Sequence, residues 1–297
     1  MTESLQLAGV VLFLVSLVLL GMPHGAVDHW VWFRAAGKKM KPLGLILFVL
    51  TYVLVAAFFF GLWLWFPVGC AIGLLGLTAY HWGEGDWIWE SAKGWKPPKS
   101  FWVWRGLIPM GIPFVVHPDM AIAVLESAVL VAANTEMAGI SAFTWPTTRW
   151  FLLGCLICVF LIQWWQGGSN RPWRLLWEDL GLIAVFVWLP PLMAIAIYFV
   201  GWHANRHVRW LARWMGPPVG RASGVVDWRR FSWAAAPFTL PAVGAVAVLA
   251  MMSPPEQGQA MAWVGSYLVW LWALTWPHAV VCHFAARQAD KEMRPLP

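Results

Sequence analysis

The sequence predicts an all-α protein embedded in a membrane, because its composition, hydropathy and spacing of charges agree. Of its 297 residues, 60% are hydrophobic and 11% are charged, whereas soluble domains carry about 25% charged residues. The mean hydropathy is +0.64, and uncharged stretches long enough to cross a bilayer recur along the chain. The net charge of +6 fits the basic cytoplasmic loops of membrane proteins and does not indicate a nucleic-acid partner.

The uncharged stretches predict a polytopic bundle of about nine helices, within a range of roughly eight to ten, since a spanning helix needs roughly 20 apolar residues. We expect one integral-membrane domain over residues 1–297. The first stretch, 4–27, follows Glu3 with no preceding basic residue, so it is interpreted as a helix and not as a cleavable signal. Residues 42–83 can hold two helices that turn near Pro67. The others are 106–118 and 120–135, which form a weak hairpin, then 150–170, 180–205, 231–255 and 257–286.

Basic residues gather in three connections that the helix count places on one side of the membrane. Because Lys and Arg mark cytoplasmic loops, this side is predicted to be the cytoplasm, with the N-terminus outside and the C-terminus inside. Arg171 and Arg174 break the pattern, but Glu178 and Asp179 are close enough in sequence to offset them. The basic residues are Arg34, Lys38, Lys39 and Lys41; Lys93, Lys96, Lys99 and Arg105; and six arginines between residues 206 and 230.

Most of the eight histidines lie inside or at the ends of apolar helices, where ionisable side chains are costly and mark functional sites. His24 and Asp28 are one helical turn apart, so the carboxylate could orient the imidazole as carboxylates do for metal ligands. Glu84 lies one turn beyond His81 and could act in the same way. Polar capping at helix ends would also explain these residues.

His203 and His207 have the i, i+4 spacing that lets one helix give two ligands to one metal. Together with His24, His81 and His278 they fall in the cytoplasmic halves of their predicted helices. One metal site near the inner leaflet would explain this shared depth. A nearly all-nitrogen ligand set suits Fe, Zn, Cu or Ni, and the residues alone do not choose among them. The four cysteines, including Cys282, are predicted to be small apolar side chains.

At these histidines the chain resembles the Brp/Blh family of bacterial and archaeal β-carotene 15,15′-dioxygenases. The resemblance extends over most of the chain, with the motifs in the same order and spacing. The motifs are P-H-G-A-x-D-H at 23–29, H-x-G-E-x-D-W at 81–87, H-x-x-R-H at 203–207 and P-H at 277–278.

The resemblance implies a multi-pass enzyme of the cell inner membrane that uses iron(II) and O₂ to cut β-carotene into two retinal molecules. The retinal would then pass to a microbial rhodopsin. The metal ligands implied are His24, His81, His203 and His207. We expect Asp28, Glu84 and His278 to orient these ligands without binding the metal themselves. No general acid or base is expected.

A carotenoid must reach such a site from the surrounding lipid, so we expect an apolar tunnel open to the bilayer. Of the 26 tryptophans, most are expected at the membrane interface. Four lie next to or near site residues and are predicted to line the tunnel. They are Trp30, Trp82, Trp202 and Trp276.

Three alternative functions stay open on these residues. A membrane di-iron desaturase or hydroxylase also uses H-x-x-x-H boxes, but it needs several of them and this chain has one. A metal or proton transporter would need polar side chains across the whole membrane, and the outer halves of these helices offer few. A carotenoid-binding protein without catalysis would show the same residues as the enzyme.

Overall fold

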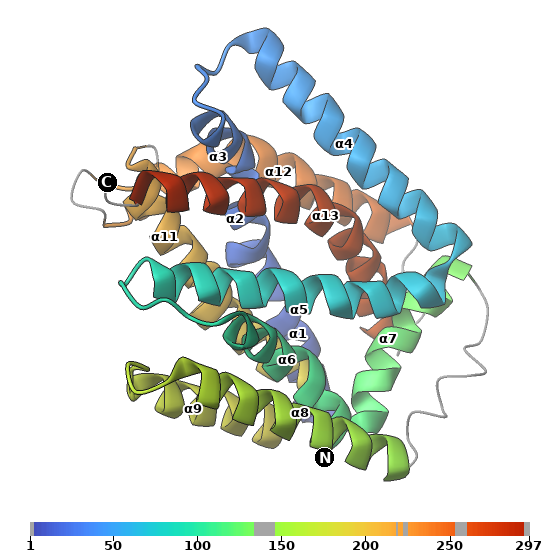
Figure 1. The fold of residues 1–297 in the computed structure, drawn as a ribbon. Helices are drawn as coiled ribbons and strands as arrows, with labels where there is room; N and C mark the ends of the chain where they lie inside the picture. The colour runs from blue at the N-terminus through green and yellow to red at the C-terminus, as the bar shows by residue number, and fades with distance from the viewer. Residues whose placement is uncertain (1–2, 134–145, 218, 222–224, 253–259, 294–297) are drawn as a thin grey trace.

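The computed structural model is mostly helical, and its described residues contain no named strand, which confirms the predicted all-α class (Figure 1). It describes all residues except 1–2, 134–145, 218, 222–224, 253–259 and 294–297. Within that part of the chain, the one β contact is an isolated bridge between Gly220 and Val226.

The N-terminal half runs through one long bent helix and four further helices. Its elements are α1 (Glu3–Ser16), the π-helix η1 (Leu17–Gly21), α2 (Met22–Ala26), α3 (Asp28–Ala35), α4 (Pro42–Trp65), α5 (Pro67–Ser91), α6 (Lys99–Val116) and α7 (Pro118–Ala133). The C-terminal half contains α8 (Pro146–Gly167), α9 (Arg174–Trp188), α10 (Pro191–Tyr198), the π-helix η3 (Phe199–Ala204), α11 (Asn205–Met215), α12 (Trp228–Met252) and α13 (Ala260–Met293).

Proline residues set several of the helix boundaries. Phe66 leaves the helical conformation at φ −134° and ψ 56°, and α5 begins at Pro67, as the sequence predicts. The predicted single helix over 180–205 is wrong, because α9 ends at Trp188 and α10 begins at Pro191. Leu189 and Pro190 are extended because a residue that precedes proline is pushed out of the α region.

Within the part of the chain that the structure describes, four helical segments are long and apolar enough to cross a membrane, and the pair α6–α7, bent by 111°, makes a fifth if it is counted as one span. The four are Leu7–Ala35, Pro42–Trp65, Thr147–Gly167 and Met261–Glu292. The chain therefore has the character of a membrane protein, with fewer clear spans than the nine predicted. Which ends face the cytoplasm stays a prediction.

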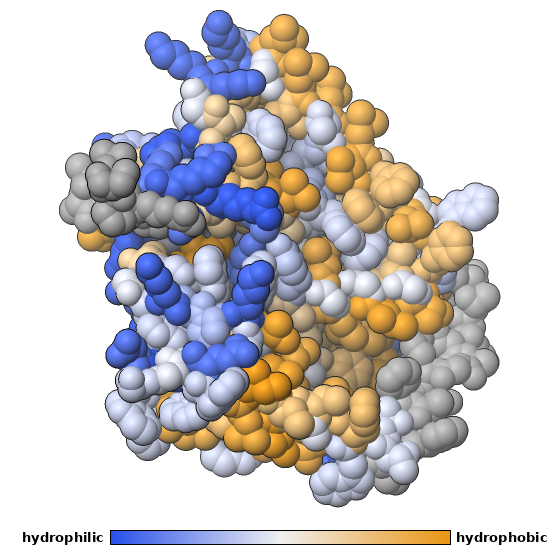
Figure 2. Space-filling view, viewed as in Figure 1, coloured by the Kyte–Doolittle hydropathy of each residue, from blue (hydrophilic) through white to orange (hydrophobic). Residues whose placement is uncertain are grey.

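Hydrophilic residues gather at one end of the molecule, and much of the remaining visible surface is hydrophobic (Figure 2). The α3–α4 connection, the α5–α6 connection and the end of α13 lie at this end (Figure 1). This agrees with the expectation that the basic connections share one side. Arg105 is an exception, because it lies within α6 and is completely buried.

Helices α5 and α6 cross at very close range, which fixes the position of the site described below. A β-carbon at Gly83 would lie 2.2 Å from the carbonyl oxygen of Trp102, and one at Gly106 would lie 1.9 Å from that of Ala79. Only glycine fits at either position. Helix α13 packs against α3, α4, α5 and α7, so it runs through the middle of the bundle.

Candidate metal centre

Five buried histidines from five helical elements converge, and we call them the histidine cluster. The ring centroids of His24 and His278 are 4.8 Å apart, as are those of His81 and His278. The rings of His81 and His203 lie 5.0 Å apart, and those of His24 and His207 lie 5.6 Å apart. The structure therefore brings together all four histidines predicted as ligands and adds His278 to them. They come from α2 (His24), α5 (His81), η3 (His203), α11 (His207) and α13 (His278).

The two π-helices among the described residues lie at this cluster. η1 directly precedes α2, which carries His24, and η3 contains His203. A π-turn accommodates one extra residue in a helix and is frequently found at functional sites. The ring of Phe199, at the start of η3, lies nearly parallel to that of His203 at 5.9 Å. The two irregular turns thus hold two of the histidines against each other, with their rings 5.9 Å apart.

Several imidazole nitrogens of the cluster have no hydrogen-bond partner. Both ring nitrogens of His81 and Nε2 of His203 are buried and unpaired. Buried polar groups are normally paired, because leaving them unpaired costs about 1–3 kcal/mol each. One ligand nitrogen from each of His24, His81 and His278 lies within 4.8 Å of the others, so one ion could be shared among them. Unpaired imidazole nitrogens at this spacing fit a transition-metal ion.

His278 lies inside the cluster. The sequence predicts it outside the ligand set, as a residue that supports the ligands. Its Nδ1 is 2.9 Å from Oδ2 of Asp28. The carboxylate accepts the hydrogen of Nδ1–H, so Nε2 is the nitrogen of His278 that could bind a metal. The prediction that Asp28 pairs with His24 is therefore wrong, because its partner is His278. Helix α2 ends at Ala26, and Val27 at φ −91° and ψ 4° interrupts the helical turn.

Glu84 also has a different partner from the predicted one, His81. Its Oε1 lies 2.5 Å from Nδ1 of His283 and 3.5 Å from the hydroxyl of Tyr80, and no hydrogen bond joins it to His81 in the described residues. This contact links α5 to α13. Glu84 consequently stabilises the packing of two helices that carry histidines of the cluster, without touching an imidazole of the cluster.

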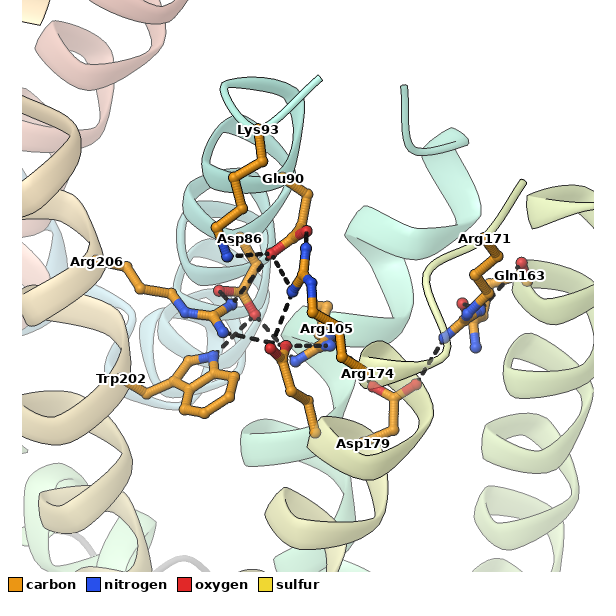
Figure 3. A network of polar contacts seen from close by, with 11 residues as sticks. Asp86, Glu90, Lys93, Arg105, Gln163, Arg171, Arg174, Asp179, Trp202 and Arg206 are labelled. Atoms are coloured by element: carbon orange, nitrogen blue, oxygen red, sulfur yellow. Dashed lines mark hydrogen bonds and ion pairs between the residues drawn. The ribbon is translucent and has the colours of Figure 1, made fainter. Parts of the chain in front are cut away.

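A largely buried set of charged residues, the ionic network, joins Asp86 of α5 to Arg206 of α11 and to the residues around them (Figure 3). Asp86 of α5 binds Nη1 of Arg206 at 2.9 Å and accepts a hydrogen bond from Nε1 of Trp202 at 3.2 Å. Arg105 lies among Asp86, Glu178 and Asp179 at 3.1 to 3.5 Å. The network joins α5 to η3 and α11, the elements that carry His81, His203 and His207. Its members are Asp86, Glu90, Arg105, Arg171, Arg174, Glu178, Asp179 and Arg206.

The sequence indicated one part of this network. Arg171 binds Asp179 at 2.8 Å, and Arg174 binds Glu178 at 3.0 Å. The expected compensation of these two arginines by the nearby carboxylates is therefore confirmed.

Apolar cavities reach the histidine cluster from two directions. The outer cavity, of about 290 Å³, lies between α2–α3, α4, α12 and α13, and His24 and His278 form part of its wall. A middle cavity of about 40 Å³ touches His24, His81 and His278. An inner cavity of about 70 Å³ lies beyond it, among α1, α5, α6, α7, α10, η3 and α13.

The tryptophans predicted to line a tunnel occupy different places. Trp82 lines the middle and inner cavities. Trp202 lies under the Arg206 guanidinium at 3.7 Å, and Trp276 stacks on Phe59 at 4.2 Å. Neither of these, nor Trp30, is among the residues that line the three cavities. Among the predicted four, Trp82 alone meets the expectation in the described structure.

Two residues at the site were missed by the sequence interpretation. Sγ of Cys282 lies 3.5 Å from Nε2 of His278 and 3.8 Å from Nε2 of His207, and the three residues form a second group suited to a metal. The i, i+4 spacing of His278 and Cys282 could have indicated this. The hydroxyl of Tyr52 donates a hydrogen bond to Asp28 at 3.1 Å, and no local pattern signals that contact.

The chain is similar to known proteins over most of its length. A family model described as β-carotene 15,15′-dioxygenase matches residues 15–285. A probable β-carotene 15,15′-dioxygenase Blh of Halobacterium salinarum is 28% identical over 287 residues, covering 90% of this chain and 81% of the relative. A β-carotene 15,15′-dioxygenase of an uncultured marine bacterium is 24% identical over 198 residues, covering 65% and 66%. No solved structure matches significantly.

Proposed function

The chain belongs to the β-carotene 15,15′-dioxygenase family and is thus a carotenoid-cleaving dioxygenase, and we propose that it cuts β-carotene at the central double bond into two retinal molecules. The observation that supports this most directly is the histidine cluster, with its unpaired nitrogens, lying between apolar cavities. A polyene and O₂ both dissolve in lipid, so both can reach such a site from the membrane.

We assign the metal as iron(II), held by His24, His81, His203 and His207, with His278 as a further imidazole available to it. Neutral imidazoles suit iron, and they leave its charge of +2 uncompensated. When bound, the iron would supply the activation of O₂. Asp28 would orient His278 through its contact with Nδ1, as carboxylates orient metal-bound histidines.

The other residues bind and shield the substrate. The cleaved C=C bond gives two carbonyl groups, and each carbon takes one atom of O₂, so the overall reaction neither consumes nor releases a proton. The site accordingly needs no general acid or base. Apolar walls that include Trp82, Phe199 and Leu271 would keep water away from reactive oxygen species.

Expression in a bacterium that makes β-carotene tests this proposal. Retinal should accumulate, as measured by chromatography, and the purified protein should hold one iron per chain. Two irons per chain would favour the di-iron alternative, and bound carotenoid without retinal would favour a binding protein. Because the proposed product would serve a microbial rhodopsin, co-expression with a rhodopsin lacking its chromophore should yield coloured holoprotein. The inner membrane is the expected location of both proteins.

A further inference from the structure

Helix α13 carries His278 and Cys282 one turn apart, and the cysteine also contacts His207 of α11. Sγ of Cys282 lies 3.5 Å from Nε2 of His278 and 3.8 Å from Nε2 of His207. It is also 3.7 Å from Nδ1 of His278, but that nitrogen is held by Asp28. All three residues are buried, and their ligand atoms lie within 4.8 Å of one another. A single ion could therefore bind all three.

The two distances from sulfur to Nε2 fit a tetrahedral zinc site. With Zn–S of about 2.3 Å, Zn–N of about 2.0–2.1 Å and tetrahedral angles, the sulfur and nitrogen ligands of one zinc ion lie about 3.6 Å apart. The observed distances of 3.5 and 3.8 Å lie on either side of that value. The thiol has one hydrogen, so without a metal it can donate to one of the two imidazoles at a time.

The charges around this group also suit a divalent cation. Metal binding replaces the hydrogen of the Cys282 thiol and releases it to water as a proton, so the sulfur binds as a thiolate. Oδ2 of Asp28 lies 2.9 Å from Nδ1 of His278. The thiolate and the carboxylate together carry two negative charges. They offset the charge of +2 on the ion in a buried place, where an uncompensated charge is costly.

We infer that His207, His278 and Cys282 form a second metal subsite inside the cluster, selective for Zn²⁺ over iron(II). Thiolate ligands favour Zn²⁺, whereas imidazoles alone suit iron as well. Three ligands leave a fourth tetrahedral position, which water or His24 can fill, since the ring of His24 lies 4.8 Å from that of His278. The subsite needs no assumption about the reaction, while its competition with iron rests on the proposed function.

The zinc and iron positions exclude each other. His278 belongs to this group and also to the group with His24 and His81, and its Nε2 can bind one ion at a time. His207 is one of the ligands that we assign to iron. A zinc ion in the subsite would withdraw both imidazoles from iron(II). Zn²⁺ should therefore displace iron from the parental protein and inhibit carotene cleavage.

Co²⁺ serves as the probe of the subsite, because a thiolate ligand gives Co²⁺ a sulfur-to-metal charge-transfer band in the near ultraviolet and an imidazole does not. Metal-free, full-length protein in lipid nanodiscs is titrated without carotenoid. Cys155→Ser/Cys158→Ser is the background, since it removes two exposed thiols. The band should appear in this background and vanish when Zn²⁺ is added. It should persist in Cys70→Ser, which removes another buried thiol, and be lost in Cys282→Ser. A background protein without the band would overturn the inference.

Affinities distinguish a zinc subsite from a thiol that serves the iron site. Cys282→Ser should weaken Zn²⁺ binding at least about tenfold, because residues that only orient a ligand already contribute about 10–100-fold. Anaerobic binding of Fe²⁺ should weaken less. Equal losses for the two metals, or an unchanged affinity for Zn²⁺, would each contradict the subsite.

Two features keep this test independent of folding and of the reaction. If Cys282→Ser fails to fold, the variant that lacks Cys70, Cys155 and Cys158 decides, because Cys282 is then the single thiol of the chain. The charge-transfer band in that variant supports the subsite, and its absence contradicts it. Neither readout uses carotenoid, so both hold whether or not the protein forms retinal.

Discussion

The histidine cluster and the ionic network are neighbouring polar regions of the bundle, yet they differ in whether their groups have partners of opposite charge within the chain. In the ionic network four arginines face four carboxylates, and each charged group has an oppositely charged partner. In the cluster, both nitrogens of His81 and one of His203 have none. Buried charges persist only when they are paired, so the charges of the network compensate one another within the chain, although single atoms such as Nε of Arg171 have no hydrogen-bond partner there. The cluster leaves imidazole nitrogens available for a metal ion.

The largest expected effect is the loss of metal when an unpaired imidazole is removed. His81→Ala should reduce bound iron from about one to near zero per chain and abolish carotene cleavage, because His81 has no partner within the protein. Iron content by elemental analysis is the measurement. His117→Ala is the control, since Nε2 of His117 binds the carbonyl oxygen of Val187 at 3.1 Å. Full iron content in His81→Ala would mean that the unpaired imidazole of His81 does not bind the metal, and the cluster would then not differ from the ionic network in this respect.

The next effect concerns the link between the network and the cluster. Asp86→Asn should weaken binding of Co²⁺, used as a spectroscopic probe, by about 10–100-fold. The reason is that Asp86 holds Arg206 and Trp202, which neighbour His207 and His203 in sequence.

Arg171→Gln is the matched control for Asp86→Asn. It breaks the buried ion pair between Arg171 and Asp179 of the same network. Neither residue lies on an element that carries a histidine of the cluster. It should lower stability and leave Co²⁺ affinity as it was. Equal losses of Co²⁺ affinity in both variants would mean that the network acts on the cluster only through general stability.

A smaller effect is expected at Asp28, which binds His278 directly. Asp28→Asn should reduce iron affinity by about tenfold, at the lower end of the usual range for carboxylates that orient a ligand histidine. Tyr52→Phe keeps the carboxylate and removes one hydrogen bond to it, so its iron affinity should lie between those of Asp28→Asn and the parental protein. If Asp28→Asn retains iron as tightly as the parental protein, His278 needs no orientation by this carboxylate.

The smallest effect on iron is expected at Glu84. Because Glu84 binds His283 and not a histidine of the cluster, Glu84→Gln should leave iron content unchanged. It should lower stability by about 1–2 kcal/mol through the weakened α5–α13 contact. Thermal unfolding in detergent measures this, with iron content determined on the same sample. A loss of iron would restore the sequence-based expectation that Glu84 supports His81.

The sequence predicted what depends on local spacing. The helical class, the break at Pro67 and the convergence of His24, His81, His203 and His207 all follow from apolar runs and from histidines placed at similar depths. The pairing of side chains between different helices could not be predicted from these patterns. Asp28 and His278 are 250 residues apart, and their contact depends on how α3 and α13 are rotated against each other. No local pattern records such a rotation.

The tryptophans illustrate the same limit. Neighbouring residues on a helix point about 100° apart, so a tryptophan next to a ligand in sequence need not face the same cavity. Trp202 precedes His203, and its indole donates to Asp86 in the ionic network. Trp82 follows His81 and does reach the cavities, where Phe199 packs against it at 5.7 Å.

Helix α4 forms one wall of the outer cavity through Phe48, Val49 and Tyr52, yet Trp63 is the single buried residue along its whole length. In a bilayer, acyl chains would therefore press on most of this wall from outside, and the lateral pressure would act on the width of the cavity. We expect KM for the carotenoid to change with acyl-chain order while iron content stays constant. Kinetics measured in stiff and fluid vesicles would then differ for a reason that lies in the lipid.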